Sequence, residues 1–392
     1  MGAGGRLGDV VHLDRGRTVE PGDLYRAHRA LLSGVGRAMV RTHRGCSAAQ
    51  PYARGRPDGA DFVSVLYVER SGLDPGGIGG SRPERVAYFG PSGTFTEAAL
   101  SRFEDGGRLT ELGAPGPVER LAADSQRAAL DMVRSGAADL ACVPIESSID
   151  GPVLPTLDPL AEGTRLQIFA ETELDIAFTI VARQDMTVAD VQTIGAYPVA
   201  AAQVRQWLAA RMPHARVVPA SSNAGAAEDV AAGTVDAGVS TALAGERLGL
   251  QTLADGVVDV EGARTRFVLV GRPGPTPPRT GADRTGVFLY LPNEPGSLAQ
   301  ALMQFSIRGV DLTRIASRPT RSGLGNYYFQ LDCTGHIDDT PVAEVLKALH
   351  RTTAEVRYLG SWPTSHTEGT PPPADRETVD WLERMRQGRE AT

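Results

Sequence analysis

The stretch Ala263-Arg264-Thr265-Arg266-Phe267 places a hydroxyl and a guanidinium side by side at the start of an apolar strand, FVLV. A second stretch, VPIESS at 143–148, places a carboxylate and two hydroxyls directly after another apolar strand. A carboxylate at the mouth of a buried strand is costly unless it is paired or functional, so Glu146 is a candidate acid or polar anchor. Together the two stretches offer acids, hydrogen-bond donors and a cation, but no metal ligands. Such a set suits an anionic substrate from which small groups are removed.

Strand-like and helix-like segments alternate around these two stretches. The strand VAYFG at 86–90 is followed by a helix over 95–103, and a helix over 125–135 precedes the strand LACVPI. A second set begins with LDIAFTIVA at 174–182 and continues with helices over 199–211 and 223–233. Such alternation predicts an α/β protein with parallel sheets covered by helices. We expect two lobes around a cleft, with a ligand at the strand ends between them.

Segments rich in Pro and Gly divide the chain. We expect an extension over 1–84, a two-lobed domain over 85–272, a linker over 273–284, a module over 285–362, and a Pro-rich linker with a terminal helix over 363–392. The chain is predicted to cross between the lobes near 170–175 and to return near 245–265. The module reads β-α-β-β-α-β, which is the ferredoxin-like order.

The first 84 residues differ from the rest in their Gly-rich stretches. Their composition favours an extension of uncertain order, or a start codon placed too early, over a dedicated domain. Apolar residues at helical spacing predict one short amphipathic helix, and VSVLYV at 63–68 predicts a strand. The residues at helical spacing are Leu24, Leu31, Leu32, Val35 and Met39.

Composition and charge exclude several classes of protein. Asp and Glu outnumber Lys and Arg by 47 to 40, for a formal net charge of -7, so the basic footprint of a nucleic-acid or anionic-membrane binder is missing. The 3 Cys lie far apart with no C-x-x-C, which argues against disulfides or a zinc site and fits a reducing cytoplasm. No apolar run approaches a membrane span. We expect a cytoplasmic protein without a metal, a nucleic-acid partner or a membrane partner.

Two further motifs place polar side chains at predicted helix N-termini, GPSGTFTEAAL at 90–100 and SSNAGAA at 221–227. Backbone N–H groups at a helix N-terminus attract anions, so either motif could hold a carboxylate. Ser and Thr are also ordinary helix caps, and on the residues alone both readings stay open. The side chains concerned are Thr94, Thr96, Ser221, Ser222 and Asn223.

In this order along the chain, the motifs resemble the signatures of the prephenate dehydratase family over residues 86 to about 362. GPSGTFTEAAL is similar to G-P-x-G-T-F-[ST]-E-x-A, residues 142–160 are similar to V-P-[IL]-E-N-S-x-x-G-x-V, and ARTRFVLVG to the family's catalytic strand. Ser147 replaces the family's Asn, which loses the reach and second donor of an amide. Gly262 and Ala263 stand where the family usually carries another Asn.

The resemblance implies a two-lobed catalytic domain, built like periplasmic binding proteins, that acts on prephenate. Thr265 carries the hydroxyl on which the family depends, and Glu146 and Ser147 are the other implied catalytic residues. Arg266 suits bidentate carboxylate binding, and Phe267 is expected at the floor of the cleft. The other implied substrate contacts are Thr94, Thr96, Ser148, Gln203, Ser221, Ser222 and Asn223.

The implied reaction removes CO2 and hydroxide from prephenate and gives phenylpyruvate for L-phenylalanine synthesis. Aromatisation drives it, so no cofactor is expected, and the enzyme mainly orients and desolvates its substrate. The changed polar positions leave open a decarboxylase that does not aromatise the ring, in a specialised-metabolite pathway. A non-catalytic solute binder is disfavoured by the polar lining of the predicted cleft. A fused chorismate mutase over 1–84 is disfavoured by the Gly and Pro content.

The C-terminal module resembles an ACT domain, which implies an amino-acid ligand such as L-phenylalanine and a homodimer or homotetramer. NEPGSLAQAL at 293–302 is similar to N-x-P-G-[AS]-L, and IASRPT at 315–320 to E-S-R-P, with Ala316 in place of Glu. Because that acid is missing, we expect a weak response to phenylalanine. The implied ligand contacts are Asn293, Pro295, Gly296, Leu298, Ser317 and Arg318.

Overall fold

The computed structural model describes residues 37–42, 45–48, 65–69, 83–320, 327–366, 369–374 and 376–389. These residues belong to two compact units, Met1–Pro75 and Gly76–Thr392. In the first unit, β1 (Arg37–Thr42), β2 (Gly45–Ala48) and β3 (Val65–Glu69) form an antiparallel sheet in the order β2-β1-β3. Met39 therefore lies in a strand paired on both sides and not in the predicted helix, whose other positions, Leu24 to Val35, lie outside the described residues.

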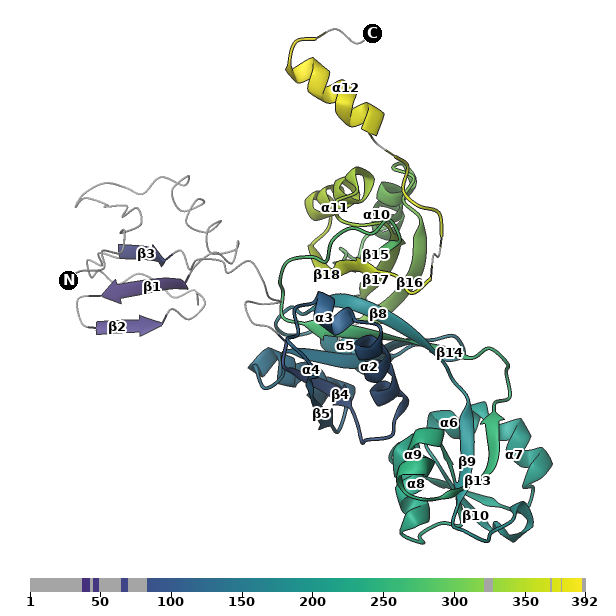
Figure 1. Cartoon of the computed structure of the whole chain (residues 1–392). Coiled ribbons are helices and arrows are strands. Elements are labelled where there is room, and N and C mark those ends of the chain that lie inside the picture. Colours follow the sequence, from purple (N-terminus) through teal and green to yellow (C-terminus); the bar gives the residue numbers. More distant parts are fainter. Residues whose placement is uncertain are drawn as a thin grey trace. The chain divides into compact units, whose positions relative to one another are not determined.

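The first lobe of the second unit is a mixed sheet in the order β5-β4-β6-β14-β8, shown in Figure 1. Strands β4, β5 and β6 are parallel, whereas β14 runs antiparallel to both of its neighbours. Its strands are β4 (Arg85–Phe89), β5 (Glu119–Ala123), β6 (Leu140–Ser147), β8 (Gln167–Asp175) and β14 (Arg264–Gly271), with the short β7 (Gly151–Pro152) paired to β6. Its helices are α2 (Phe95–Asp105), α3 (Arg108–Glu111), α4 (Gln126–Ser135) and α5 (Leu154–Ala161). Ser125 caps α4, because its hydroxyl accepts from the N–H of Ala128.

The second lobe is a five-stranded sheet in the order β11-β10-β12-β9-β13. Its strands are β9 (Phe178–Ala182), β10 (Thr193–Ala196), β11 (Arg216–Pro219), β12 (Ala237–Ser240) and β13 (Gln251–Val257). Its helical segments are η2 (Val188–Asp190), α6 (Pro198–Gln203), α7 (Arg205–Arg211), α8 (Asn223–Ala231) and α9 (Ala242–Arg247). The chain enters this lobe between β8 and β9 and leaves it between β13 and β14, so two short connections join the lobes.

Two predicted elements of the second lobe are divided in the structure. The strand predicted over 174–182 is the end of β8 and the whole of β9, because the connection between the lobes falls inside it. The helix predicted over 199–211 is α6 and α7, separated at Val204. At this break the carboxylate of Asp259 accepts from the N–H groups of Gln206 and Trp207, at 2.7 and 2.9 Å, and so caps a new helix start.

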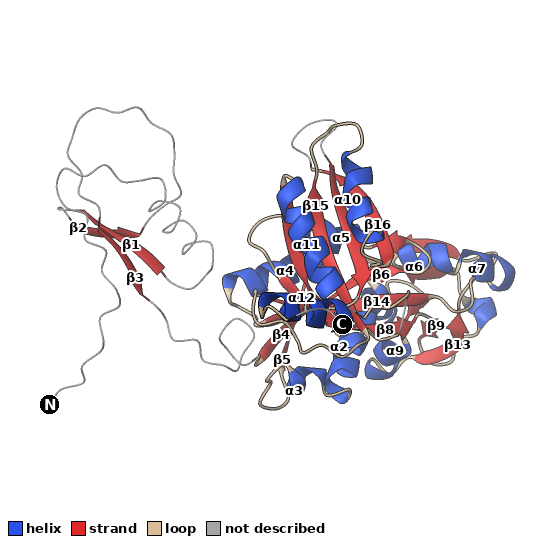
Figure 2. Ribbon diagram, turned by 90° about the horizontal axis from the view of Figure 1, so that it is seen from above, coloured by secondary structure: helices blue, strands red, loops and turns tan. Residues whose placement is uncertain are grey.

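The C-terminal module has the predicted β-α-β-β-α-β order, and its sheet runs β16-β17-β15-β18. Its elements are β15 (Asp283–Tyr290), α10 (Ser297–Ser306), β16 (Leu312–Pro319), β17 (Tyr327–Thr334), α11 (Thr340–Thr352) and β18 (Glu355–Pro363), and α12 (Arg376–Arg386) follows. Helices α10 and α11 lie side by side on one face of this sheet (Figure 2). The other face packs on the first lobe.

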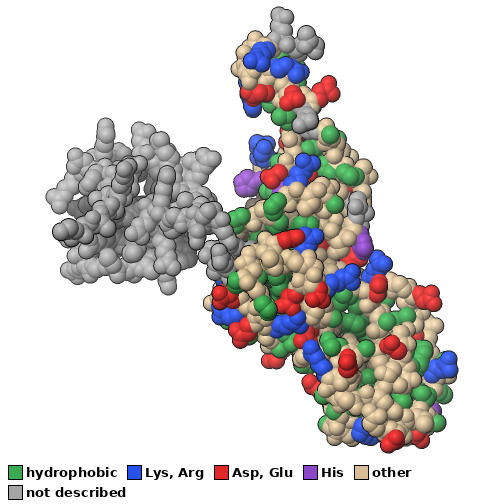
Figure 3. Space-filling model, viewed as in Figure 1, with side chains coloured by type: hydrophobic (Ala, Val, Ile, Leu, Met, Phe, Trp, Pro, Cys, Tyr) green, Lys and Arg blue, Asp and Glu red, His purple; other side chains and the backbone are tan. Residues whose placement is uncertain are grey.

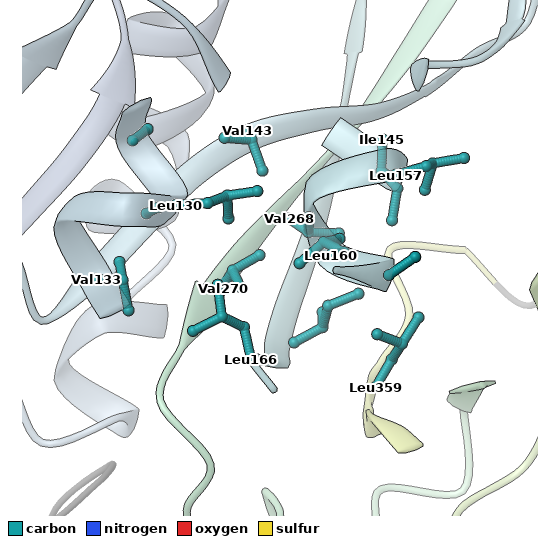
Figure 4. Packing of buried hydrophobic residues seen from close by; sticks show 14 of the residues in the cluster. Leu130, Val133, Val143, Ile145, Leu157, Leu160, Leu166, Val268, Val270 and Leu359 are labelled. Atoms are coloured by element: carbon teal, nitrogen blue, oxygen red, sulfur yellow. The ribbon is translucent and has the colours of Figure 1, made fainter. Parts of the chain in front are cut away.

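A single apolar core joins this module to the first lobe. Leu130, Val143, Leu157 and Val268 of the lobe pack with Leu359 of β18, as Figure 4 shows. Trp362, which is fully buried, belongs to the same cluster. Each such side chain contributes roughly 1.5–3 kcal/mol on full burial, so the module and the lobe form one folding unit.

Among the described residues, no helix is long and apolar enough to cross a membrane. On the face drawn in Figure 3, acidic and basic side chains are interspersed. This mixture agrees with the modest net charge of -7.

Candidate active site

A cavity of about 330 Å³ is lined by residues of both lobes. Most of the surface of its wall is apolar, and aromatic side chains such as Phe95, Phe178 and Phe267 contribute to it. Eight of the residues predicted from the sequence line it, namely Thr94, Thr96, Ser147, Gln203, Ser222, Asn223, Thr265 and Phe267. The structure therefore brings together side chains that are up to 173 positions apart in the sequence, from Thr94 to Phe267.

Strand β14 presents its residues alternately to two different surroundings. Thr265 and Phe267 line the cavity, whereas Arg266, between them, lies on the opposite face of the sheet. Thr265 is paired directly with Ser147 of β6, so two hydroxyl-bearing residues lie next to each other on the cavity wall. Thr265 is half-buried at this point.

Arg266 does not line the cavity, which does not fit the predicted role of binding a substrate carboxylate. Its guanidinium donates to Glu171 at 3.0 Å, to Glu146 at 2.6 Å and to Asp332 of β17 at 3.1 Å. Only 5% of its side chain is exposed. Burial alone would lower the pKa of Arg266, but the carboxylates of Glu171, Asp332 and Glu146 outweigh it and raise that pKa.

Glu146 is also outside the cavity lining, although it was predicted as a catalytic acid. Its carboxylate accepts from Arg266 and lies 3.4 Å from the Nε of Arg314. Residues 266 and 146 are partners in the β14–β6 register, and both lie on the face opposite to Thr265 and Ser147. The alternation of an extended strand thus separates the pairs Thr265–Ser147 and Arg266–Glu146.

Ser148 and Ser221, two predicted substrate contacts, do not line the cavity either. The Ser148 hydroxyl accepts from the N–H of Arg264 at 2.9 Å, and the Ser148 N–H donates to the Arg264 carbonyl. Ser148 therefore attaches the start of β14 to the end of β6. Ser221 is exposed, next to the helix cap.

The hydroxyls of Thr94 and Ser222 act as helix caps. Thr94 accepts from the N–H of Glu97 in α2, and Ser222 accepts from the N–H of Gly225 in α8 at 2.9 Å. The first N–H groups of a helix have no partner inside it, so both helix starts still offer donors toward the cavity. In α8, the Oδ1 atom of Asn223 is buried and without a hydrogen-bond partner among the described residues.

Among the described residues that line this cavity, none is Arg, Lys or His. An anionic ligand would therefore be held by N–H groups, hydroxyls and amides of the described wall, and not by an ion pair. This donor set differs from the cation predicted at Arg266. It still suits carboxylates, because oriented dipoles act strongly where water is excluded.

One acidic residue that the sequence reading passed over lines the cavity. Asp150 accepts from the Nε2 of Gln203 at 2.6 Å and so joins the first lobe to α6 of the second. The signal for it was its place two residues after VPIESS, in the turn that the Ser147 hydroxyl organises by accepting from the Asp150 N–H. Because a carboxylate can only accept, this contact fixes which end of the Gln203 amide faces Asp150.

Two more contacts hold the lobes together beside the cavity. The Thr241 hydroxyl donates to the Gly93 carbonyl at 2.6 Å, and Arg247 pairs with Glu97 at 2.6 Å. Burial would raise the pKa of Glu97, but the hydrogen bond from Arg247 and that from the Gly93 N–H outweigh it and lower that pKa. In the described part of the chain, no group of three or more His, Cys, Asp or Glu is placed to hold a metal ion.

Comparison with known proteins agrees with this architecture. Residues 86–275 match the family model for prephenate dehydratase, and residues 285–351 match the model for the ACT domain. Prephenate dehydratase of Mycolicibacterium vanbaalenii is 61% identical over 308 residues, which are 78% of this chain and 99% of the relative. The chain belongs to the prephenate dehydratase family. The family resemblance of the motifs and the predicted carbon–oxygen lyase class are thereby confirmed.

Two further prephenate dehydratases are similar over the same share of this chain. The enzyme of Mycobacterium tuberculosis is 61% identical over 305 residues, which are 78% of this chain and 95% of the relative. The crystal structure of the prephenate dehydratase from Arthrobacter aurescens, in complex with L-Phe, is 38% identical with a TM-score of 0.69. The match covers 78% of this chain and 100% of the Arthrobacter aurescens chain. The two-lobed α/β fold followed by an ACT domain is that of the family.

The predicted ligand contacts of the ACT domain lie in different surroundings. Gly296, in the loop that holds Asn293 and Pro295, has a left-handed φ of 86° at the start of α10, which explains the need for glycine. Leu298 lies in the first turn of α10. Ser317 is exposed on β16. Arg318, on the other face of that strand, pairs with Asp158 of the first lobe through two hydrogen bonds of 3.2 and 3.1 Å.

Ala316, where the ACT motif has Glu, shares the face of Arg318. It lies opposite Gln330 of β17, on the side of the sheet that packs on the first lobe. The loop over 293–296 leads into α10, which packs on the other side. Ala316 and α10 therefore lie on opposite faces of the sheet.

The buried carboxylates predict a stability that falls in acid. Burial would raise the pKa of Glu171 and of Asp332, but Arg266 with its neighbouring arginines outweighs it, and both pKa values are lowered from 4.5 and 3.8. A lowered folded-state pKa stabilises the fold above the unfolded pKa, and this contribution is lost as the pH falls through the folded value. We expect the urea midpoint to be level above about pH 5 and to fall below about pH 4. In Glu171→Gln the urea midpoint should fall less steeply below about pH 4. An unchanged dependence on pH would contradict the lowered pKa of Glu171.

Proposed function

We propose that the cavity between the lobes binds prephenate and converts it to phenylpyruvate, CO2 and water, in cytoplasmic L-phenylalanine synthesis. The observation that carries this proposal is the placement of Thr265 beside Ser147 on the wall of a largely apolar cavity, within the strand motif of the family. The start of α2, with Thr94 and Thr96, and the start of α8, with Ser222 and Asn223, supply donors for the two substrate carboxylates.

For this reaction the protein mainly has to orient the substrate and to surround it with apolar walls. The bond between the ring and its carboxylate breaks, and its electron pair enters the ring. The hydroxyl on the opposite ring carbon leaves and takes up one proton from solvent, which gives water. Apolar walls around Phe178 and Phe267 favour the loss of a charged carboxylate as neutral CO2. We assign to the Thr265 hydroxyl a hydrogen bond to the departing oxygen, which strengthens as negative charge develops there.

The product identifies the reaction. The purified chain, incubated with prephenate in buffer with a metal chelator, should give phenylpyruvate in equal amount to the prephenate consumed, measured by ultraviolet absorbance and proton NMR. A dihydro product that retains the hydroxyl would show a decarboxylase that does not aromatise the ring. Prephenate left unchanged would refute both functions.

We propose that a second copy of the chain covers the edge of the ACT sheet. Strand β16 is the outermost strand of that sheet. Exposed apolar side chains occur on β16, with Ile315 at 52%, on α10, with Met303 at 55%, and directly after α10, with Ile307 at 64%. An unpaired edge with apolar neighbours is suited to pairing with its own copy by two-fold symmetry. Light scattering should give the mass of a homodimer or homotetramer, and a monomer at micromolar concentration would refute this assembly.

We expect the ACT domain to bind L-phenylalanine but to inhibit the enzyme only weakly. Inhibition needs a ligand that binds one state of the enzyme better than another. Ala316 lacks the carboxylate of the ACT motif, so one polar side chain that could distinguish the two states at the contact with the first lobe is missing. In Ala316→Glu a carboxylate would lie between Arg314 and Arg318 on the face that packs on the first lobe. Steady-state rates should show stronger inhibition in this variant and not in Ala316→Gln, which has a similar size without the charge. Steep inhibition of the wild type at low phenylalanine would contradict this expectation.

A further inference from the structure

Behind the cavity, three arginines and three carboxylates form a cluster between the first lobe and the ACT domain, and all of them except the half-buried Glu146 are buried. The most buried members are Glu171, with 0% of its side chain exposed, and Asp332, with 1%. The formal charges of the six groups cancel. The members of this charge cluster are Glu146, Glu171 and Arg266 of the first lobe and Arg284, Arg314 and Asp332 of the ACT domain.

Several of the close contacts in the charge cluster cross between the two domains. Arg266 of β14 donates to Asp332 of β17, and Arg284 of β15 donates to Glu171 of β8 at 3.1 Å. Arg314 of β16 donates to the carbonyl of Ile145 in β6 at 3.3 Å. The ACT domain thus supplies charges that neutralise groups of the catalytic sheet.

The cluster is attached to the two strands that carry the cavity hydroxyls. Arg266 follows Thr265 directly in β14, and Glu146 precedes Ser147 directly in β6. Each pair is joined by one peptide unit and lies on opposite faces of the sheet. The position of the Thr265 hydroxyl therefore depends on where the ion pairs of Arg266 hold this part of β14.

Two atoms of the cluster lack a hydrogen bond among the described residues, the Oδ1 of Asp332 and the Nη1 of Arg314. Arg314 Nη1 is 3.7 Å from the Oδ2 of Asp332, close enough for an ion pair but too long for a hydrogen bond. A buried network whose members are only partly hydrogen-bonded is costly, and fewer contacts there oppose a change of pairing. The β17 end of the cluster can therefore change its pairing more readily than the Glu171 end, where Trp362 also donates.

We propose that Asp332 and Arg266 are positioning residues, through which the ACT domain sets the geometry of Thr265 for the prephenate reaction. This inference rests on the proposed function of the cavity. It makes the ACT domain part of the catalytic framework even without an amino-acid ligand. A ligand of the ACT domain that shifts β17 would change the position of Thr265 through the ion pair between Asp332 and Arg266.

A double-mutant cycle tests the positioning role. Asp332→Asn removes the charge with little change in shape, and we expect kcat to fall about tenfold or more with a smaller change in KM, because small displacements of a reacting group are costly. In a Thr265→Ala background the same substitution should change kcat by less than about twofold, since the group it positions is already gone. A loss of equal size in both backgrounds would overturn the proposal.

The matched control is Asp158→Asn, which breaks another contact between the same domains. Asp158 accepts from Arg318 and from the Tyr328 hydroxyl, away from β14. The loss of this contact should lower the thermal midpoint but leave kcat unchanged, and a fall in kcat equal to that of Asp332→Asn would overturn the proposal.

If circular dichroism shows that Asp332→Asn does not fold, the cycle is run with Arg266→Lys. The same results are then expected, and equal losses in both backgrounds would again overturn the proposal. A wild type that leaves prephenate unchanged would refute the function and this inference together, whereas an additive cycle refutes the inference alone.

Discussion

Replacing Thr265 with alanine should lower kcat by about a hundredfold or more while KM changes little. The Thr265 side chain lies on the cavity wall beside Ser147, and the proposed hydrogen bond strengthens only as the hydroxyl leaves. An interaction that is stronger in the transition state than in the bound substrate appears in kcat and not in substrate affinity. Steady-state kinetics with prephenate measures both constants.

The control for this prediction is Thr265→Ser, which retains the hydroxyl and should keep much of the activity. Circular dichroism should show that both variants are folded, because Thr265 is only half-buried and contributes little to the core. An alanine variant whose kcat is within a few-fold of the wild type would remove Thr265 from the reaction.

Replacing Arg266 with alanine should be among the most destabilising single changes in the chain. It leaves Glu146, Glu171 and Asp332 without their shared cation, and removing one partner of a buried ion pair typically costs about 3–5 kcal/mol. We expect a large fall in the urea midpoint near pH 7. Part of the loss should be recovered near pH 4, where the carboxylates left unpaired take up protons.

The neighbouring residue Arg264 provides the matched control. Its side chain is 51% exposed and pairs with Asp175, which is 79% exposed. Exposed ion pairs contribute about 0–1 kcal/mol, so Arg264→Ala should shift the urea midpoint only slightly. Equal shifts for Arg264→Ala and Arg266→Ala would contradict the assignment of Arg266 to the buried cluster.

The sequence was sufficient to predict the kinds of element and their order. Apolar runs and turn residues located both sets of alternating strands and helices and the β-α-β-β-α-β module. Strand β8 was not recognised beforehand, because Glu171 interrupts its apolar pattern in the middle of a buried segment. That residue is tolerated there because Arg266, Arg284 and Trp362, which are far away in the sequence, donate to it. The break at Val204 likewise depends on a distant residue, Asp259.

For the site, the motifs located the right strands and helix starts but not the direction of each side chain. Treating Thr265, Arg266 and Phe267 as one group ignored the two-residue period of a strand, which places Arg266 on the other face. The same argument applied to Glu146 and Ser147 would have separated them. The partners of the Arg266 and Glu146 side chains could not be predicted from the sequence, because they include Asp332 and Arg314 of the ACT domain, which packs behind β14.

The most direct measurement is a crystal structure of the Thr265→Ala variant with prephenate bound, since slow turnover should preserve the substrate. We expect the ring hydroxyl next to position 265 and the two carboxylates at the starts of α2 and α8. Arg266 should still pair with Glu171 and Asp332 behind the sheet. A substrate carboxylate paired with the guanidinium of Arg266, or prephenate bound away from the cavity, would contradict this assignment of the two faces of β14.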